Sequence, residues 1–183
     1  MKINDTIQLC CDFLGEKDLK TLVGTTSGDD VQNAKLDAML TCLNLAYEEI
    51  VTEYLPILFT ETVSANSGII NFSALSKPIS GIIAVKDEGG KDLAYSQSAD
   101  HIEVNANQAQ ITYQIVPEKF EFGDEAKVIF PERLLAYGTA REYLFMQGLS
   151  QEALLYEKRF KDALISFVRK KSLLTLPKRQ WKN

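Results

Sequence analysis

The side chains that could perform nucleophilic or acid–base chemistry are few and widely spaced. His101 is the single histidine among the 183 residues, and a Ser–His or Cys–His mechanism would need a nucleophile and an orienting carboxylate beside it. Ser98 and Cys42 are conceivable nucleophiles, but their spacing from His101 favours neither. The glycine-rich phosphate-binding, nucleophile-elbow and zinc-protease motifs are missing. We predict a surface or strand-facing histidine, no catalytic residues, and a protein that is not an enzyme.

Carboxylates and thiols could in principle bind a metal ion. Glu48, Glu49 and Glu53 form one acidic group and the acids within 118–125 form another, and we interpret both as solvated surface. Three cysteines at positions 10, 11 and 42 give an odd count without repeated spacing, whereas a zinc site needs about four ligands. The sequence therefore predicts buried, reduced thiols, no metal site and no cofactor.

Charge is distributed unevenly along a chain of ordinary globular composition. Hydrophobic residues make up 45% and charged residues 25%, and no apolar run approaches the roughly 18–20 residues that span a bilayer. From Lys158 onward nine basic residues oppose one acid, Asp162, although the whole chain carries −5. An acidic body with a basic end indicates docking on the acidic surface of another chain rather than binding to phosphate.

Residues 1–56 are predicted to form the first helices. A short helix should follow a cap at Asn4 or Asp5 and end at Gly15, with a long loop after it. A longer helix should begin at Asp29 or Asp30 and continue to Pro56. Its apolar stripe is predicted to comprise Leu36, Leu40, Leu43, Tyr47, Ile50 and Tyr54.

Residues 57–117 are predicted to form a small antiparallel β sub-lobe. The short segments rich in β-branched and aromatic residues are 57–63, 69–72, 79–86, 93–95, 101–104 and 111–116. Gly89 and Gly90 provide a hairpin turn. The alternation over 111–115 predicts one buried face and one solvated face.

Residues 118–171 are predicted to form an acidic linker followed by a helical hairpin. Pro131 suits the first helical position, Gly148 a left-handed stop, and Ser150 the cap of the second helix. The apolar side of that helix is predicted to comprise Leu155, Phe160, Ala163, Leu164, Phe167 and Val168. The predicted fold is a single α+β domain, an antiparallel bundle of about four helices with the β sub-lobe inserted between the second and third.

The basic tail, residues 172–183, carries leucines and a tryptophan among its bases. Such a tail either folds back on its own domain or docks on a neighbouring chain, with apolar anchors in pockets and bases on acidic rims. The predicted docking residues are Lys170, Lys171, Leu173, Leu174, Leu176, Lys178, Arg179 and Trp181.

The last third of the chain contains PERLLAYG at 131–138, AREY at 140–143, QGL at 147–149, EA at 152–153 and YEKRFKDAL at 156–164. This set of segments resembles bacteriophage head-to-tail connector (adaptor) proteins. In that group such a hairpin follows a β segment and a proline. This chain departs from the group in the acidic linker at 120–125, the long loop after Gly15 and a large β sub-lobe.

The resemblance implies a structural virion protein. Connector subunits form homo-oligomeric rings, often of twelve copies, that bind the portal protein, contact other neck or tail proteins and prolong the DNA channel. DNA would pass through without sequence-specific binding. Residues 1–5 lack the apolar segment of a signal peptide, so we expect synthesis in the cytoplasm. The resemblance implies a bacterial host and a final location in the virion neck, without membrane contact.

A second hypothesis belongs to a different class of protein. The chain could be a bacterial helical regulatory or nucleic-acid-binding protein whose basic end contacts phosphate. That hypothesis predicts salt-sensitive DNA binding that is lost when Lys170, Lys171, Lys178 and Arg179 are neutralised.

Overall fold

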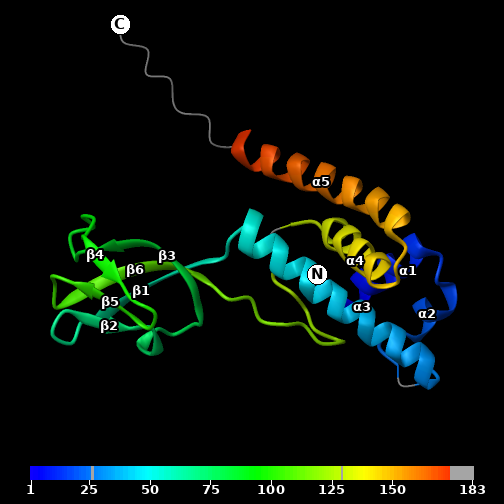
Figure 1. Ribbon diagram of the computed structural model, residues 1–183, viewed down its shortest axis with the longest axis horizontal. Helices are drawn as coiled ribbons and strands as arrows, with labels where there is room; N and C mark the ends of the chain where they lie inside the picture. Colours follow the sequence, from blue (N-terminus) through cyan, green and yellow to red (C-terminus); the bar gives the residue numbers. More distant parts are fainter. Residues whose placement is uncertain (26, 129, 174–183) are drawn as a thin grey trace, which may run out of the picture. The chain divides into compact units, whose positions relative to one another are not determined.

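The computed structural model describes residues 1–25, 27–128 and 130–173, which divide into two compact units (Figure 1). The helical unit contains residues 1–47 and the described residues from 119 onward, and the β unit contains 48–118. The described part holds five α-helices and two small antiparallel sheets, with all the strands between α3 and α4. This confirms the predicted α+β class and the β insertion between helices.

The helical unit begins with α1, Ile3–Leu14, which ends at Gly15 in the left-handed conformation as predicted. Its predicted cap is wrong, because the helix begins before Asn4 and has no side-chain cap. The Ile3 N–H instead donates to the Asp124 carbonyl at 3.0 Å, so the linker satisfies this end of the helix. The loop expected after Gly15 contains a short helix, α2, Lys17–Leu22, whose Leu19 is buried.

The long helix α3, Asp30–Glu49, begins at a reciprocal cap. Asp29 Oδ1 accepts from the Gln32 N–H at 2.8 Å, and Gln32 Oε1 accepts from the Asp29 N–H at 3.0 Å, which confirms the acidic cap. The predicted continuation as an α-helix to Pro56 is wrong. Ile50–Tyr54 form a π-helical turn that closes with Leu55 N–H donating to the Ile50 carbonyl at 2.8 Å. Tyr54 is consequently exposed rather than part of the buried stripe.

The β unit contains two three-stranded sheets with antiparallel pairing throughout. Their orders are β1-β6-β3 and β2-β5-β4. The bounds are β1 Leu58–Ser64, β2 Ile69–Asn71, β3 Ile79–Lys86, β4 Tyr95–Gln97, β5 His101–Val104 and β6 Gln108–Ile115. The strand predicted at 93–95 begins later than expected, because Leu93 N–H donates to the Val85 carbonyl at the end of the turn before β4 begins.

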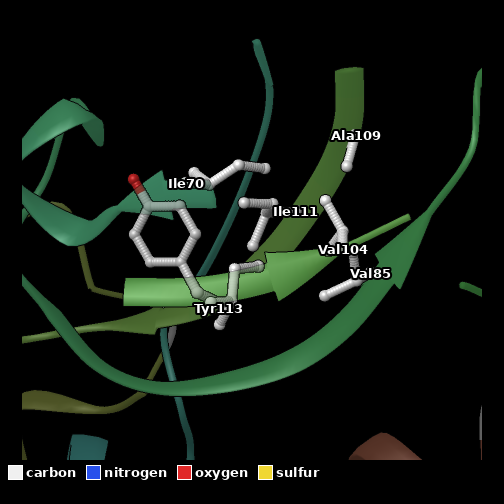
Figure 2. Close-up of a cluster of buried hydrophobic side chains, with 7 residues drawn as sticks. Ile70, Val85, Val104, Ala109, Ile111 and Tyr113 are labelled. Atoms are coloured by element: carbon white, nitrogen blue, oxygen red, sulfur yellow. The ribbon is translucent and has the colours of Figure 1, made fainter. Parts of the chain in front are cut away.

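Buried side chains from several strands form the core of the β unit (Figure 2). Ile111 and Tyr113 of β6 are buried, whereas Thr112 and Gln114 between them are partly exposed, which confirms the predicted alternation. The turn at Gly89 and Gly90 is also present, closed by a bridge from Lys86 to Asp92. The sheets do not extend it into a hairpin, because β3 pairs with β6 and β4 pairs with β5.

The C-terminal hairpin consists of α4, Glu132–Met146, and α5, Ser150–Leu173. Gly148 adopts a φ of 76° between them, as predicted. The two other boundary predictions are each displaced by one residue: Pro131 precedes the first helical residue of α4, and Ser150 is itself the first residue of α5. The predicted helix end at 169–171 is extended to Leu173.

Helix α4 packs closely against both α3 and α5. A Cβ atom on Gly138 would lie 2.8 Å from the Ala46 Cβ atom of α3 and 3.2 Å from the Phe160 ring of α5. Only a residue without a side chain fits at this approach. The contacts at Gly138 therefore show that α3, α4 and α5 meet at this point.

Candidate interaction surface

The inner face of α5 is fixed against the rest of the helical unit. Ala153, Tyr156, Phe160 and Leu164 are buried at spacings of three and four residues. The Tyr156 hydroxyl donates to the Phe13 carbonyl of α1 at 2.5 Å. These contacts fix the rotation of α5 about its own axis and so determine which side chains point outward.

A nearly buried arginine strengthens this attachment. Arg141 of α4 is 5% exposed, and its guanidinium lies 2.8 Å from Glu157 of α5 and 2.5 Å from Glu142. It also stacks over the Phe160 ring at 4.7 Å. Burial would raise the pKa of Glu157, but hydrogen bonds from Lys161 and Arg141 outweigh it and lower that pKa below its usual range.

The outer face of α5 is unusually apolar. Side chains at steps of four and three residues form a row that we call the α5 ridge: Leu154, Lys158, Lys161, Ile165 and Val168. Leu154 is 60% exposed, Ile165 49% and Val168 40%, and Leu155 beside them is 51% exposed. A surface helix of a lone globular unit normally turns its apolar residues inward. Exposed apolar side chains in a row indicate an interaction surface.

The ridge corrects the predicted apolar side of α5. Leu155 and Val168 were expected to face the core but are exposed, whereas Ala153 and Tyr156 were not expected there and are buried. Phe160 and Leu164 are buried as predicted, and Ala163 and Phe167 are partly buried. The spacing of Ala153, Tyr156, Phe160 and Leu164 is the sequence signal that could have identified the inner face.

The predicted docking residues fall at and beyond the end of α5. The last turns of α5 include Lys170, Lys171 and Leu173. The predictions for the tail lie outside the described residues: Leu174, Leu176, Lys178, Arg179 and Trp181.

The conceivable catalytic residues belong to both compact units, Cys42 to the helical unit and Ser98 and His101 to the β unit. The His101 ring meets carboxylates, with Nδ1 2.7 Å from Asp100 and Nε2 3.8 Å from Glu103, and the hydrogen bond to Asp100 raises its pKa. Ser98 instead donates its backbone N–H to the His101 carbonyl at 2.9 Å.

The three cysteines are free and buried, which confirms the predicted thiols. Burial raises the pKa of Cys10 well above its usual value and raises those of Cys11 and Cys42 to about 11. Thiols with raised pKa values carry little thiolate at neutral pH and are weak nucleophiles. Their surroundings are those of small core side chains.

Residues 1–25, 27–128 and 130–173 contain neither a candidate metal site nor a candidate membrane span. No three His, Cys, Asp or Glu side chains gather there to hold a metal ion. No helix in that part of the chain is long and apolar enough to cross a membrane. A cavity of about 380 Å³ lies beside α3 and the linker. The side-chain oxygen of Asn4 in its wall accepts a hydrogen bond from the Gly123 N–H at 2.9 Å, so this oxygen has a partner within the chain.

Comparison with known proteins gives no assignment: no protein family model matches the sequence, and no curated protein matches it.

Proposed function

We propose that the protein is a structural subunit of a homo-oligomeric ring, a bacteriophage head-to-tail connector that joins the portal to the tail in the virion neck. The α5 ridge carries the proposal, because it exposes Leu154, Ile165 and Val168 on a helix whose other face is already packed. Such a surface suits a protein–protein contact repeated around a ring, where many copies multiply a weak contact into high avidity.

The basic C-terminal segment supplies a second contact in this proposal. Residues 172–183 would dock on the portal protein, with leucines and Trp181 as anchors and bases on an acidic rim. An acidic channel wall would repel DNA phosphates and let the genome slide through without sequence-specific binding.

The test compares the full chain with a truncated chain that lacks residues 172–183, using co-sedimentation with a phage portal protein. The full chain should co-sediment as a ring visible by electron microscopy, and the truncated chain should stay folded by circular dichroism but lose binding. Lys127→Ala, at an exposed linker position, is the control and should bind normally. Unchanged binding of the truncated chain would contradict the docking arm, and no binding of the full chain would contradict the connector role.

The alternative proposal is nucleic-acid binding by the basic end. It is favoured by the exposure of Lys158, Arg159 and Arg169 on α5. In that case the protein would bind duplex DNA at low salt, and affinity would fall steeply as salt rises. Absence of DNA binding at low salt would exclude this function.

A further inference from the structure

We infer that the α5 ridge binds α3 of a neighbouring copy of this chain, so that a basic helix of one subunit packs on an acidic helix of the next. This deepens the proposed function and rests on it for the premise that the assembly contains copies of one chain. In the described helical unit, the large apolar side chains that are exposed lie in two places: Val31 and Leu45 on α3, and the α4–α5 hairpin with its ridge.

The outward side of α3 carries acidic side chains, whereas the ridge carries basic ones. We call the row opposite its buried stripe the α3 face: Asp30, Asp37, Thr41 and Leu45. Leu45 is 50% exposed, and both acids are exposed. At 1.5 Å per residue the ridge is about 21 Å long and the α3 face about 22 Å long, so the two rows match in extent.

Charge determines which rows can pair. Two ridges brought together would bring Lys158 of one copy near Lys158 of the other, and two α3 faces would oppose Asp37 with Asp37. Both symmetric pairs are therefore disfavoured. A ridge on an α3 face instead brings opposite charges together and covers apolar side chains on both helices.

The two rows belong to different sides of the helical unit. Ala46 of α3 and Phe160 of α5 both lie against Gly138 of α4, so the buried sides of α3 and α5 face this contact and the two exposed rows do not. One copy can then engage a neighbour at each row. A contact between two different surfaces of the same chain is head-to-tail, and it produces a closed ring when the rotation between neighbours closes.

Nucleic acid is the less suitable occupant of the ridge. Phosphate would satisfy Lys158 and Arg169, but it would leave the exposed Leu154, Ile165 and Val168 without an apolar partner. The α3 helix of a neighbouring copy has both acids for the basic side chains and exposed apolar side chains for the leucine, isoleucine and valine of the ridge.

A charge exchange between the two rows tests the inference. One variant carries Lys158→Glu on the ridge and Arg169→Glu beside Val168, and the other carries Asp30→Lys and Asp37→Lys on the α3 face. Each variant alone should lose self-association, because like charges then meet at every contact. An equimolar mixture should recover it, since each reversed row finds an oppositely charged row on the other variant. Sedimentation velocity at low salt, free and with portal protein, measures the fraction assembled, which should fall at least about tenfold for each variant alone.

Control variants each carry one charge reversal on α2. Lys17→Glu and Asp18→Lys lie at exposed positions and should assemble like the unmodified chain. The inference is overturned if the two row variants assemble normally, if their mixture stays unassembled, or if the unmodified chain forms no oligomer even with portal protein. It is also overturned if the ridge variant loses only DNA binding.

The outcome separates this interface from the connector role. Portal-bound rings that survive both charge reversals would contradict the α3–α5 contact and support the proposed function. Assembly that follows the charge exchange without any portal binding would support the contact and contradict the connector role.

Discussion

Tyr113 combines apolar burial with a charge-assisted hydrogen bond in the β unit. Its ring is fully buried in the core (Figure 2), and its hydroxyl donates to Glu61 Oε1 at 2.5 Å. Burial, together with this bond, raises the pKa of Tyr113 to about 12. Burial opposes ionisation of Glu61, but hydrogen bonds from Ser76 and Tyr113 outweigh it and lower the pKa of that carboxyl.

Removing the hydroxyl should destabilise the β unit in a pH-dependent way. Tyr113→Phe should lower the free energy of unfolding by about 1–3 kcal/mol near neutral pH. Because the folded pKa lies above the ordinary value of 10.0, the contribution is complete below pH 10.0 and is lost as pH rises toward about 12. Urea unfolding near pH 7 and near pH 11 should show a smaller difference between variant and unmodified chain at the higher pH.

Tyr95→Phe, at an exposed position of β4, is the control and should change stability little at either pH. An equal loss for Tyr113→Phe at both pH values would show that the hydroxyl contributes without its titration. No loss at all would contradict the role assigned to the Glu61 bond.

At the scale of elements, local sequence patterns predict which segments form strands. Contacts between distant residues determine the order of the strands and which face of α5 is buried. The alternation of Ile111 and Tyr113 predicted β6, because strand periodicity is a property of adjacent residues. The order β1-β6-β3 was not predictable, because each strand's choice of partner depends on distant residues. The orientation of α5 likewise depends on Arg141 meeting Glu157, and its leucines occur on both sides.

The α4–α5 hairpin should lose stability when its ion pair is weakened. Glu157→Gln should lower the free energy of unfolding by about 1–3 kcal/mol near pH 7, because Arg141 would lose one of its charged partners. The folded pKa of Glu157 lies below its ordinary 4.5, so its contribution is present above pH 4.5 and is lost as pH falls through the folded value. The difference from the unmodified chain should therefore shrink in acid.

Urea unfolding followed by far-ultraviolet circular dichroism, near neutral pH and well below pH 4.5, measures this difference. Glu152→Gln, in the exposed first turn of α5, is the matched control and should have little effect. A Glu157→Gln effect that stays constant into acid would contradict the ion pair as its cause.

At the scale of the whole molecule, each compact unit has buried side chains of its own, and the chain passes between the units near residues 47 and 118. The sequence predicted the inserted strands, because β-rich segments stand between two helical patterns. The sequence did not predict the ridge, because Leu154 and Val168 are of the same apolar types as core residues. Only their packing shows that they are exposed.

Local destabilisation should stay within one unit. Tyr113→Phe should increase amide hydrogen exchange within 48–118, whereas Gly138→Leu should increase it within 1–47 and 119–173, because a leucine would overpack against Ala46 and Phe160. Exchange measured by mass spectrometry after proteolysis resolves the two regions. Equal increases across both units for either variant would show that they unfold together.

The interruption of the helical unit by the β unit has a consequence for synthesis on the ribosome. Residues 48–118 form a continuous stretch and can fold once they emerge, whereas α1 and α3 precede α4, their packing partner, by the whole insertion. At roughly 5–20 residues per second, this delay is on the order of ten seconds. During that time Cys10, Cys11 and Cys42 lack the cover of α4 and α5, so the thiols should react with alkylating agents in nascent chains and become protected when the hairpin is complete.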